Sequence, residues 1–169
     1  MRKIAFLLSA AALCLLMAGC GGQKAALRAE DVALTVHGET VTADSSVDAL
    51  LDLFGADYDY AEAISCVYTG MEKTYQYPDC ILYTYPGEQG DCLLEIYCTA
   101  DAASVKGPGI GSSRAEVEAA YGSGYTQAGD VMTYTLDSAD TQMEPATIYF
   151  ELQDGTVCAV GLTAEHRAE

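Results

Sequence analysis

The feature that most constrains the fold of this chain is a pattern that occurs twice. Two segments, 45–55 and 112–122, each begin with Ser-Ser, place apolar residues at helical spacing and end in glycine. A constant offset of 67 residues relates Ser45, Ser46, Leu50, Phe54 and Gly55 to Ser112, Ser113, Val117, Tyr121 and Gly122. Because a fixed period is the signature of a repeated structural unit, the sequence predicts an internal duplication.

Both segments are predicted to be short amphipathic helices. The first has apolar residues at i, i+3, i+4 and i+7 from Val47 to Phe54, and Gly55 provides the stop. In the second, Ser113 and Glu116 have the spacing of a capping box. Each helix is therefore expected to bury one face and to end at its glycine.

The segments after the two helices also correspond, the first pair at an offset of 59 residues and the second and third pairs at 66. In these segments, runs of β-branched and aromatic residues are flanked by turn residues, a pattern that predicts strands. These runs are 73–77, 81–85 and 92–96 in the first half and 132–136, 147–151 and 158–162 in the second. A small hairpin, 32–36 with 40–42, precedes the first helix.

The expected fold class is α+β, with two tandem repeats of a helix followed by an antiparallel meander. The first repeat with its hairpin covers 31–106 and the second covers 107–165. Both helices should lie on one face of an antiparallel sheet, leaving the other face in water.

The N-terminus has the pattern of a bacterial export signal. Arg2 and Lys3 precede an uncharged run, 4–18, which is shorter than the about 20 apolar residues that span a bilayer. Small residues directly before Cys20 resemble a lipobox. The resemblance implies a signal peptide over 1–19 and a diacylglycerol anchor on Cys20, followed by a tether to residue 30. It places the protein on the extracytoplasmic face of the cell membrane. Secretion after cleavage near Ala18 and an uncleaved anchor stay open as alternatives.

The charge of the chain excludes one class of partner. The sequence has 8 Lys plus Arg against 25 Asp plus Glu, a formal charge of −17, and loss of Arg2 and Lys3 with the signal makes it −19. Nucleic acids are bound through basic patches, so we expect no nucleic-acid partner. A basic partner or divalent cations are electrostatically favoured, although a simply solvated acidic surface also fits.

Five cysteines remain in the predicted folded part: Cys66, Cys80, Cys92, Cys98 and Cys158. An exported protein can form disulfides, but an odd number leaves at least one thiol unpaired, and the pairing stays open. We expect Cys92 and Cys158 to act as small core residues. Because no Cys-x2-Cys pair occurs and the chain has two histidines, the spacing predicts no zinc site. We expect no metal and no cofactor.

The pattern of Gly111-Ser112-Ser113, Val117 and Tyr121-Gly122 before strands resembles the repeat of the β-lactamase inhibitor protein fold. It is also similar to the small lipoprotein subunit of the outer-membrane barrel-assembly machinery. The stretch from Ser65 to Pro86 more closely resembles uncharacterised surface lipoproteins of Gram-positive anaerobes. These resemblances imply a non-catalytic envelope protein whose sheet binds another protein. The chain lacks the tryptophan usual on such inhibitory sheets.

Tyrosine is the dominant aromatic residue, with 12 Tyr against 3 Phe and no Trp. Tyrosine combines a large contact area with few rotatable bonds and a polar tip, which suits recognition surfaces. We therefore predict a binding surface on the strands, made of Tyr75, Tyr77, Tyr83, Tyr85 and Tyr149. Cross-strand tyrosine pairs that only stabilise the sheet are the alternative.

The sequence thus predicts a monomeric, non-catalytic lipoprotein that recognises a protein or an envelope component. Two alternatives belong to other classes. One is an envelope hydrolase that uses acidic residues. The other is a Ca²⁺-dependent adhesion module built on Asp57, Asp59 and Glu62, although this segment lacks an EF-hand pattern and is expected to be a loop. His37, next to a glycine, is expected to be a solvated turn residue.

Overall fold

The computed structural model describes residues 27–138, 140 and 142–167. The predicted signal peptide and the lipidation site at Cys20 lie outside this part of the chain. Of the helices that the structure describes, none has the length and apolar character needed to cross a membrane.

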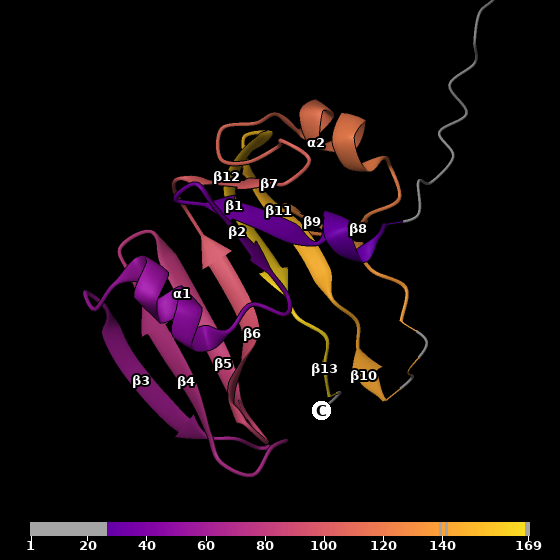
Figure 1. The fold of residues 1–169 in the computed structure, drawn as a ribbon. Coiled ribbons are helices and arrows are strands. Elements are labelled where there is room, and N and C mark those ends of the chain that lie inside the picture. The colour runs from indigo at the N-terminus through magenta and orange to yellow at the C-terminus, as the bar shows by residue number, and fades with distance from the viewer. Residues whose placement is uncertain (1–26, 139, 141, 168–169) are drawn as a thin grey trace, which may run out of the picture.

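The architecture is α+β and is dominated by one antiparallel sheet of eight strands (Figure 1). In spatial order the strands are β3 (Asp59–Ile64), β4 (Met71–Gln76), β5 (Cys80–Gly87), β6 (Gly90–Cys98), β12 (Thr156–Thr163), β11 (Thr147–Gln153), β9 (Val131–Thr135) and β8 (Thr126–Ala128). The first four follow one helix in the chain and the last four follow the other. In each group the first strand lies at an outer edge, and the last strands, β6 and β12, pair at the centre.

Within the described residues, two α-helices begin and end where the sequence predicts. They are α1 (Val47–Phe54) and α2 (Arg114–Tyr121). Gly55 and Gly122 close them with φ values of 81° and 82°, in the left-handed region that glycine adopts without a steric penalty. At the start of α2 the predicted capping box is present, because the Ser113 hydroxyl accepts from the Glu116 amide while Glu116 accepts from the Ser113 amide.

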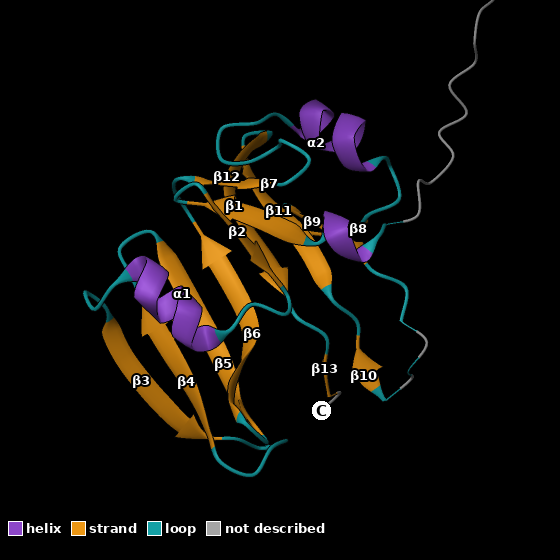
Figure 2. Cartoon of the chain, in the orientation of Figure 1, coloured by secondary structure: helices purple, strands orange, loops and turns teal. Residues whose placement is uncertain are grey.

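Both helices pack on the same face of the sheet. Phe54 of α1 contacts Tyr77 beyond the end of β4, with ring centroids 5.2 Å apart, and Figure 2 shows α1 lying across the strands of the first half. Tyr121 of α2 contacts Phe150 of β11 at 5.5 Å. Since Phe150 and Ile148 alternate with Tyr149 along β11, the helices cover one face and leave Tyr149 on the other.

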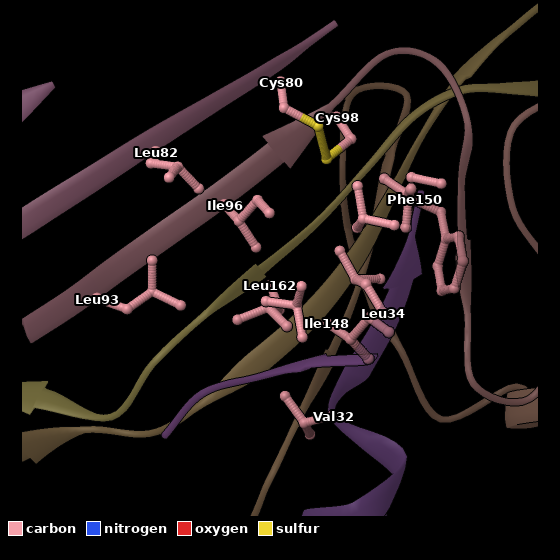
Figure 3. Packing of buried hydrophobic residues seen from close by; sticks show 14 of the residues in the cluster. Val32, Leu34, Cys80, Leu82, Leu93, Ile96, Cys98, Ile148, Phe150 and Leu162 are labelled. Carbon is pink, nitrogen blue, oxygen red and sulfur yellow. A yellow bond between two sulfur atoms is a disulfide. The ribbon is translucent and has the colours of Figure 1, made fainter. Parts of the chain in front are cut away.

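A second, three-stranded sheet covers the middle of the same face. It consists of β2 (Glu39–Thr42), β1 (Ala33–Val36) and β7 (Ala102–Ser104). The β1–β2 pair is the predicted hairpin. Leu34 and Val36 are fully buried and join the core formed by Leu82, Ile96, Ile148, Phe150 and Leu162 of the large sheet (Figure 3). The elements outside these layers are a 3-10 helix, Ala29–Asp31, and the short pair β10 (Met143–Glu144) with β13 (His166–Arg167).

One disulfide joins Cys80 at the start of β5 to Cys98 at the end of β6, which lie opposite each other in register. Among the described cysteines, Cys66, Cys92 and Cys158 are free thiols. Cys66 is exposed, whereas Cys92 and Cys158 are half-buried. The expectation that these last two are core residues is therefore wrong, because both lie on strand positions that the core does not enclose.

The prediction of a loop over residues 57–62 is also wrong at its C-terminal end. Residues Asp59–Ile64 form β3, the edge strand of the large sheet, paired with β4. All six side chains are exposed, including Ile64 at 81%. An edge strand that buries no side chain carries no apolar alternation, so the usual strand signal is missing from its sequence.

Candidate functional site

The face of the large sheet that the helices leave uncovered carries three tyrosines and two glutamates. They are Tyr83 on β5, Glu95 and Tyr97 on β6, and Tyr149 and Glu151 on β11, and we call this set the tyrosine face. All five side chains are half-buried. In register, Tyr83 lies opposite Glu95, while Tyr97 and Tyr149 flank Gly161 of β12 on either side.

Two crossed hydrogen bonds hold the centre of the tyrosine face. The Tyr97 hydroxyl donates to Glu151 at 3.0 Å, and the Tyr149 hydroxyl donates to Glu95. The two rings are nearly parallel, with centroids 6.5 Å apart. Each bond therefore bridges from β6 to β11 across β12, which fixes the orientation of both rings.

Gly161 makes this arrangement sterically possible. A Cβ atom at this position would overlap the Tyr149 hydroxyl and lie 2.7 Å from the Ile96 carbonyl oxygen. Because glycine has no side chain, the Tyr149 ring lies directly over β12 and reaches Glu95 on the far strand. Glycine is thus required at position 161 because the Tyr149 ring packs against it, and not because the backbone turns there.

The local environment keeps the tyrosine hydroxyls protonated. Burial, followed by the hydrogen bond to Glu151 and its negative charge, raises the pKa of Tyr97 to about 12. Burial first and Glu95 second raise the pKa of Tyr149 further above its usual value. At neutral pH both hydroxyl groups are hydrogen-bond donors with a fixed direction. The face therefore presents fixed polar groups between aromatic rings.

Tyr75 and Tyr77 do not belong to this face, which corrects the predicted binding surface. They are 7% and 5% exposed and lie beneath α1, where Tyr58 contacts both rings at 5.2 and 5.4 Å. The Tyr77 hydroxyl donates to the Gly55 carbonyl, the C-cap residue of α1. These two tyrosines are core residues that anchor the first helix.

Tyr85 has a different contact from the rest of the predicted set. A β-bulge follows Tyr83, and the Tyr85 ring stacks on Tyr68 at 4.5 Å. The Tyr68 hydroxyl accepts from the backbone amide of Arg167 in β13. Of the five predicted tyrosines, Tyr83 and Tyr149 lie on the tyrosine face.

The sequence prediction missed Tyr97, Glu95, Glu151 and Gly161 as members of the site. A signal for them exists in the alternation of Glu95-Ile96-Tyr97 and Tyr149-Phe150-Glu151. In each triplet the Tyr and Glu share a face, and the middle residue lies in the core. Recognising that the two triplets are partners requires knowing that β12 lies between their strands.

A cavity of about 600 Å³ lies on the helix side, between the segment before α1, the β5–β6 hairpin and the chain near β10 and β13. Its lining includes three acids that bear on the hydrolase alternative, Asp44, Asp91 and Glu165. Asp91 accepts from Lys73 Nζ at 2.6 Å, and Glu165 accepts from the Ser138 hydroxyl at 2.7 Å. Asp91 and Glu165 are thus engaged, which makes them poor candidates for an acid–base pair, whereas Asp44 has no side-chain partner among the described residues.

The acids proposed for Ca²⁺ binding do not converge. Asp59 lies opposite Gln76 and Glu62 lies opposite Lys73, so the two carboxylates leave β3 on opposite faces. Glu62 instead accepts a hydrogen bond from Tyr60. This geometry keeps Asp59 and Glu62 from sharing one ion on a single face of β3, which counts against the adhesion hypothesis built on Asp57, Asp59 and Glu62.

The chain matches no protein-family model, no curated protein and no solved structure.

Proposed function

We propose that this chain is a lipid-anchored, non-catalytic protein of the cell envelope that binds a protein partner through the tyrosine face. The observation that carries the proposal is the crossed pair Tyr97–Glu151 and Tyr149–Glu95 on a sheet face that neither helix covers. Rigid aromatic rings with oriented hydroxyls lose little conformational entropy on binding, which favours recognition.

The charge of the sheet indicates the chemistry of the partner. Among the described residues of the eight-stranded sheet, Lys73 is the one basic residue. It lies on the helix side, near Tyr75. The tyrosine face has Glu95 and Glu151 and no basic residue of its own. A partner with Lys or Arg around an apolar centre is complementary to it, and its association should weaken as salt is added.

We also propose that the body consists of two helix-meander repeats, arranged as in the β-lactamase inhibitor protein fold. The reversed order of the two strand groups about the β6–β12 pair supports this arrangement. The equivalent glycine caps of α1 and α2 support it as well. In this account duplication produced a sheet twice as wide, and the tyrosine face spans the join.

The lipid anchor is proposed from the sequence before Cys20. Labelled palmitate should be incorporated into the protein in growing cells and should be lost in Cys20→Ala. Labelling of the Cys20→Ala variant at the wild-type level would contradict the anchor and would leave the binding proposal intact.

The binding proposal is tested by partner recovery from detergent-solubilised envelopes. We expect Tyr83→Ala/Tyr97→Ala/Tyr149→Ala to lose the partner that the wild-type protein recovers. The matched control, Tyr60→Ala/Tyr125→Ala, changes tyrosines off this face and should retain it. Circular dichroism of both variants checks that each is folded. Equal recovery by the folded triple variant would refute the proposal.

A further inference from the structure

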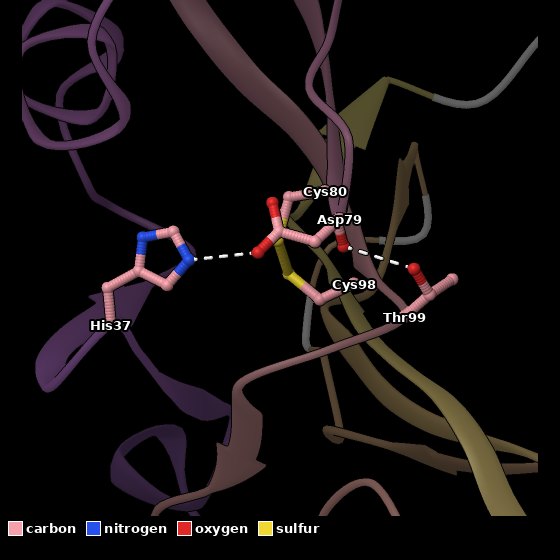
Figure 4. Close-up of a disulfide and its surroundings, with 5 residues drawn as sticks. All are labelled: His37, Asp79, Cys80, Cys98 and Thr99. Atoms are coloured by element: carbon pink, nitrogen blue, oxygen red, sulfur yellow. Dashed lines mark hydrogen bonds and ion pairs between the residues drawn. A yellow bond between two sulfur atoms is a disulfide. The ribbon is translucent and has the colours of Figure 1, made fainter.

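Three turns that are distant in the sequence meet at one corner of the molecule. His37 lies in the β1–β2 turn, Asp79 precedes β5, and Asp101 lies in the turn between β6 and β7. His37 Nε2 and Asp79 Oδ2 are 3.0 Å apart, and a dashed line marks this contact in Figure 4. One nitrogen or oxygen atom from each of His37, Asp79 and Asp101 lies within 4.8 Å of the others.

Rigid structure surrounds these three side chains. The Cys80–Cys98 disulfide joins the residue after Asp79 to the strand end that leads to Asp101 (Figure 4). The Asp79 carbonyl accepts from both the amide and the hydroxyl of Thr99, at 2.8 and 3.3 Å. The turn that contains Asp79 and the turn that contains Asp101 are therefore joined by the disulfide and by hydrogen bonds.

His37, in a turn of the three-stranded sheet, has contacts of its own that hold it in place. Its amide donates to the Asp101 carbonyl at 3.4 Å, and Phe54 of α1 packs edge-on against the imidazole with centroids 5.4 Å apart. The His37 side chain is 36% exposed and that of Asp79 is 27% exposed, so solvent and ions reach the group.

Among the described residues, no Lys or Arg side chain neutralises the negative charge of this corner. The ion pairs among the described residues join Arg28, Lys73 and Lys106 to other acids, and none joins Lys or Arg to Asp79 or Asp101. His37 is the basic side chain beside Asp79, and Asp101 has no ion-pair partner among the described residues. A cation placed among the three side chains would supply the missing charge.

We propose that His37, Asp79 and Asp101 form a binding site for a divalent transition-metal ion, with Zn²⁺ as the best match. At the tetrahedral angle, two ligand atoms bound to one Zn²⁺ at about 2.0–2.2 Å are separated by about 3.3–3.6 Å, so the His37–Asp79 spacing of 3.0 Å needs only a small increase to hold the ion. Imidazole with carboxylates suits Zn²⁺ and its neighbours, whereas Ca²⁺ and Mg²⁺ select oxygen ligands alone.

The site has a structural consequence. His37 belongs to the three-stranded sheet, and Asp79 to the large sheet, so a bound ion would clamp the two layers together. Three protein ligands also leave a coordination position for water or for a group of another molecule. The site lies outside the tyrosine face, and the proposal goes beyond the binding function given above.

Calorimetric titration with ZnCl₂ tests the site. The protein carries Cys66→Ser/Cys92→Ser/Cys158→Ser, because the free thiols would themselves bind zinc. We expect one ion per chain and no measurable binding of CaCl₂. Absence of zinc binding in this protein would overturn the proposal.

Substitutions in the same protein locate the ion. His37→Asn removes the imidazole while tolerating the left-handed backbone at this turn, where φ is 51°. We expect it to weaken zinc binding by more than the roughly 10- to 100-fold that loss of a second-shell partner costs. Asp79→Asn and Asp101→Asn should each weaken it as well.

The other histidine provides the matched control. His166→Ala should bind zinc like the parent, because His166 lies in β13, outside the corner. The Co²⁺-loaded parent should show d–d absorption bands that are lost in His37→Asn and kept in His166→Ala. Equal zinc affinity in folded His37→Asn and in the parent would place the ion elsewhere and refute the site.

Discussion

The Cys80–Cys98 disulfide should contribute strongly to the stability of this small domain. It closes a loop whose ends are 18 residues apart in the sequence, and both cysteines are buried, at 2% and 0% exposure. In the chain-entropy treatment, closing a loop of this length in the unfolded state stabilises the native state by about 3 kcal/mol. For a domain of this size that free energy corresponds to a melting temperature higher by about 10 °C.

Comparing oxidised with reduced wild-type protein isolates this effect, because both forms keep the two sulfur atoms in the core. The free energy of unfolding is measured by urea titration with and without a thiol reductant. Circular dichroism monitors the unfolding. Cys66→Ala serves as the control, since Cys66 is an exposed free thiol and its loss should leave both curves unchanged. If the unfolding free energies of the oxidised and reduced forms agree within about 1 kcal/mol, the loop-closure reasoning fails for this protein.

Three further predictions address the tyrosine face and the helix caps. Gly161→Ala should destabilise the fold by about 1–3 kcal/mol in urea unfolding, because the added methyl group collides with Tyr149, and a neutral effect would contradict the packing described at this position. Ser113→Ala should lower the unfolding free energy by about 1 kcal/mol through loss of the cap on the Glu116 amide, whereas Ser113→Gly should cost only a few tenths. Alkaline pH should destabilise the protein, because the pKa of Tyr97 is raised to about 12 in the native state whereas tyrosine in the unfolded chain ionises near pH 10. The contribution of Tyr97 to stability is therefore complete below pH 10 and is lost as the pH rises through 12. Tyrosinate absorbance at 295 nm checks the last prediction, and titration of all tyrosines near pH 10 in the folded protein would contradict it.

Local patterns in the sequence were sufficient for the elements that bury a continuous face. The helix from Val47 to Phe54 has apolar spacing and a glycine stop, and the Ser113–Glu116 capping box occurs as predicted. The core strands alternate clearly, as in Ile148 and Phe150 of β11. These signals depend only on neighbours within a few residues, so they can be read before the fold is known.

The parts that failed depend on contacts between distant segments. Alternation shows that Tyr75 and Tyr77 share a face, but the packing of α1 decides that this face is buried. The disulfide depends on the register that places Cys80 opposite Cys98. The same holds for His37, which reads as an isolated turn residue until two other turns bring Asp79 and Asp101 beside it.

The central claim, that the tyrosine face is the recognition surface, is tested most directly by site-specific photocrosslinking in intact cells. A benzophenone amino acid replaces Tyr83 in one strain and Tyr60 in another, because Tyr60 is 49% exposed but lies on the helix side of the sheet. We predict a light-dependent adduct of one defined mass from position 83 and none from position 60. Adducts from position 60 alone, or no adduct from position 83, would contradict the claim.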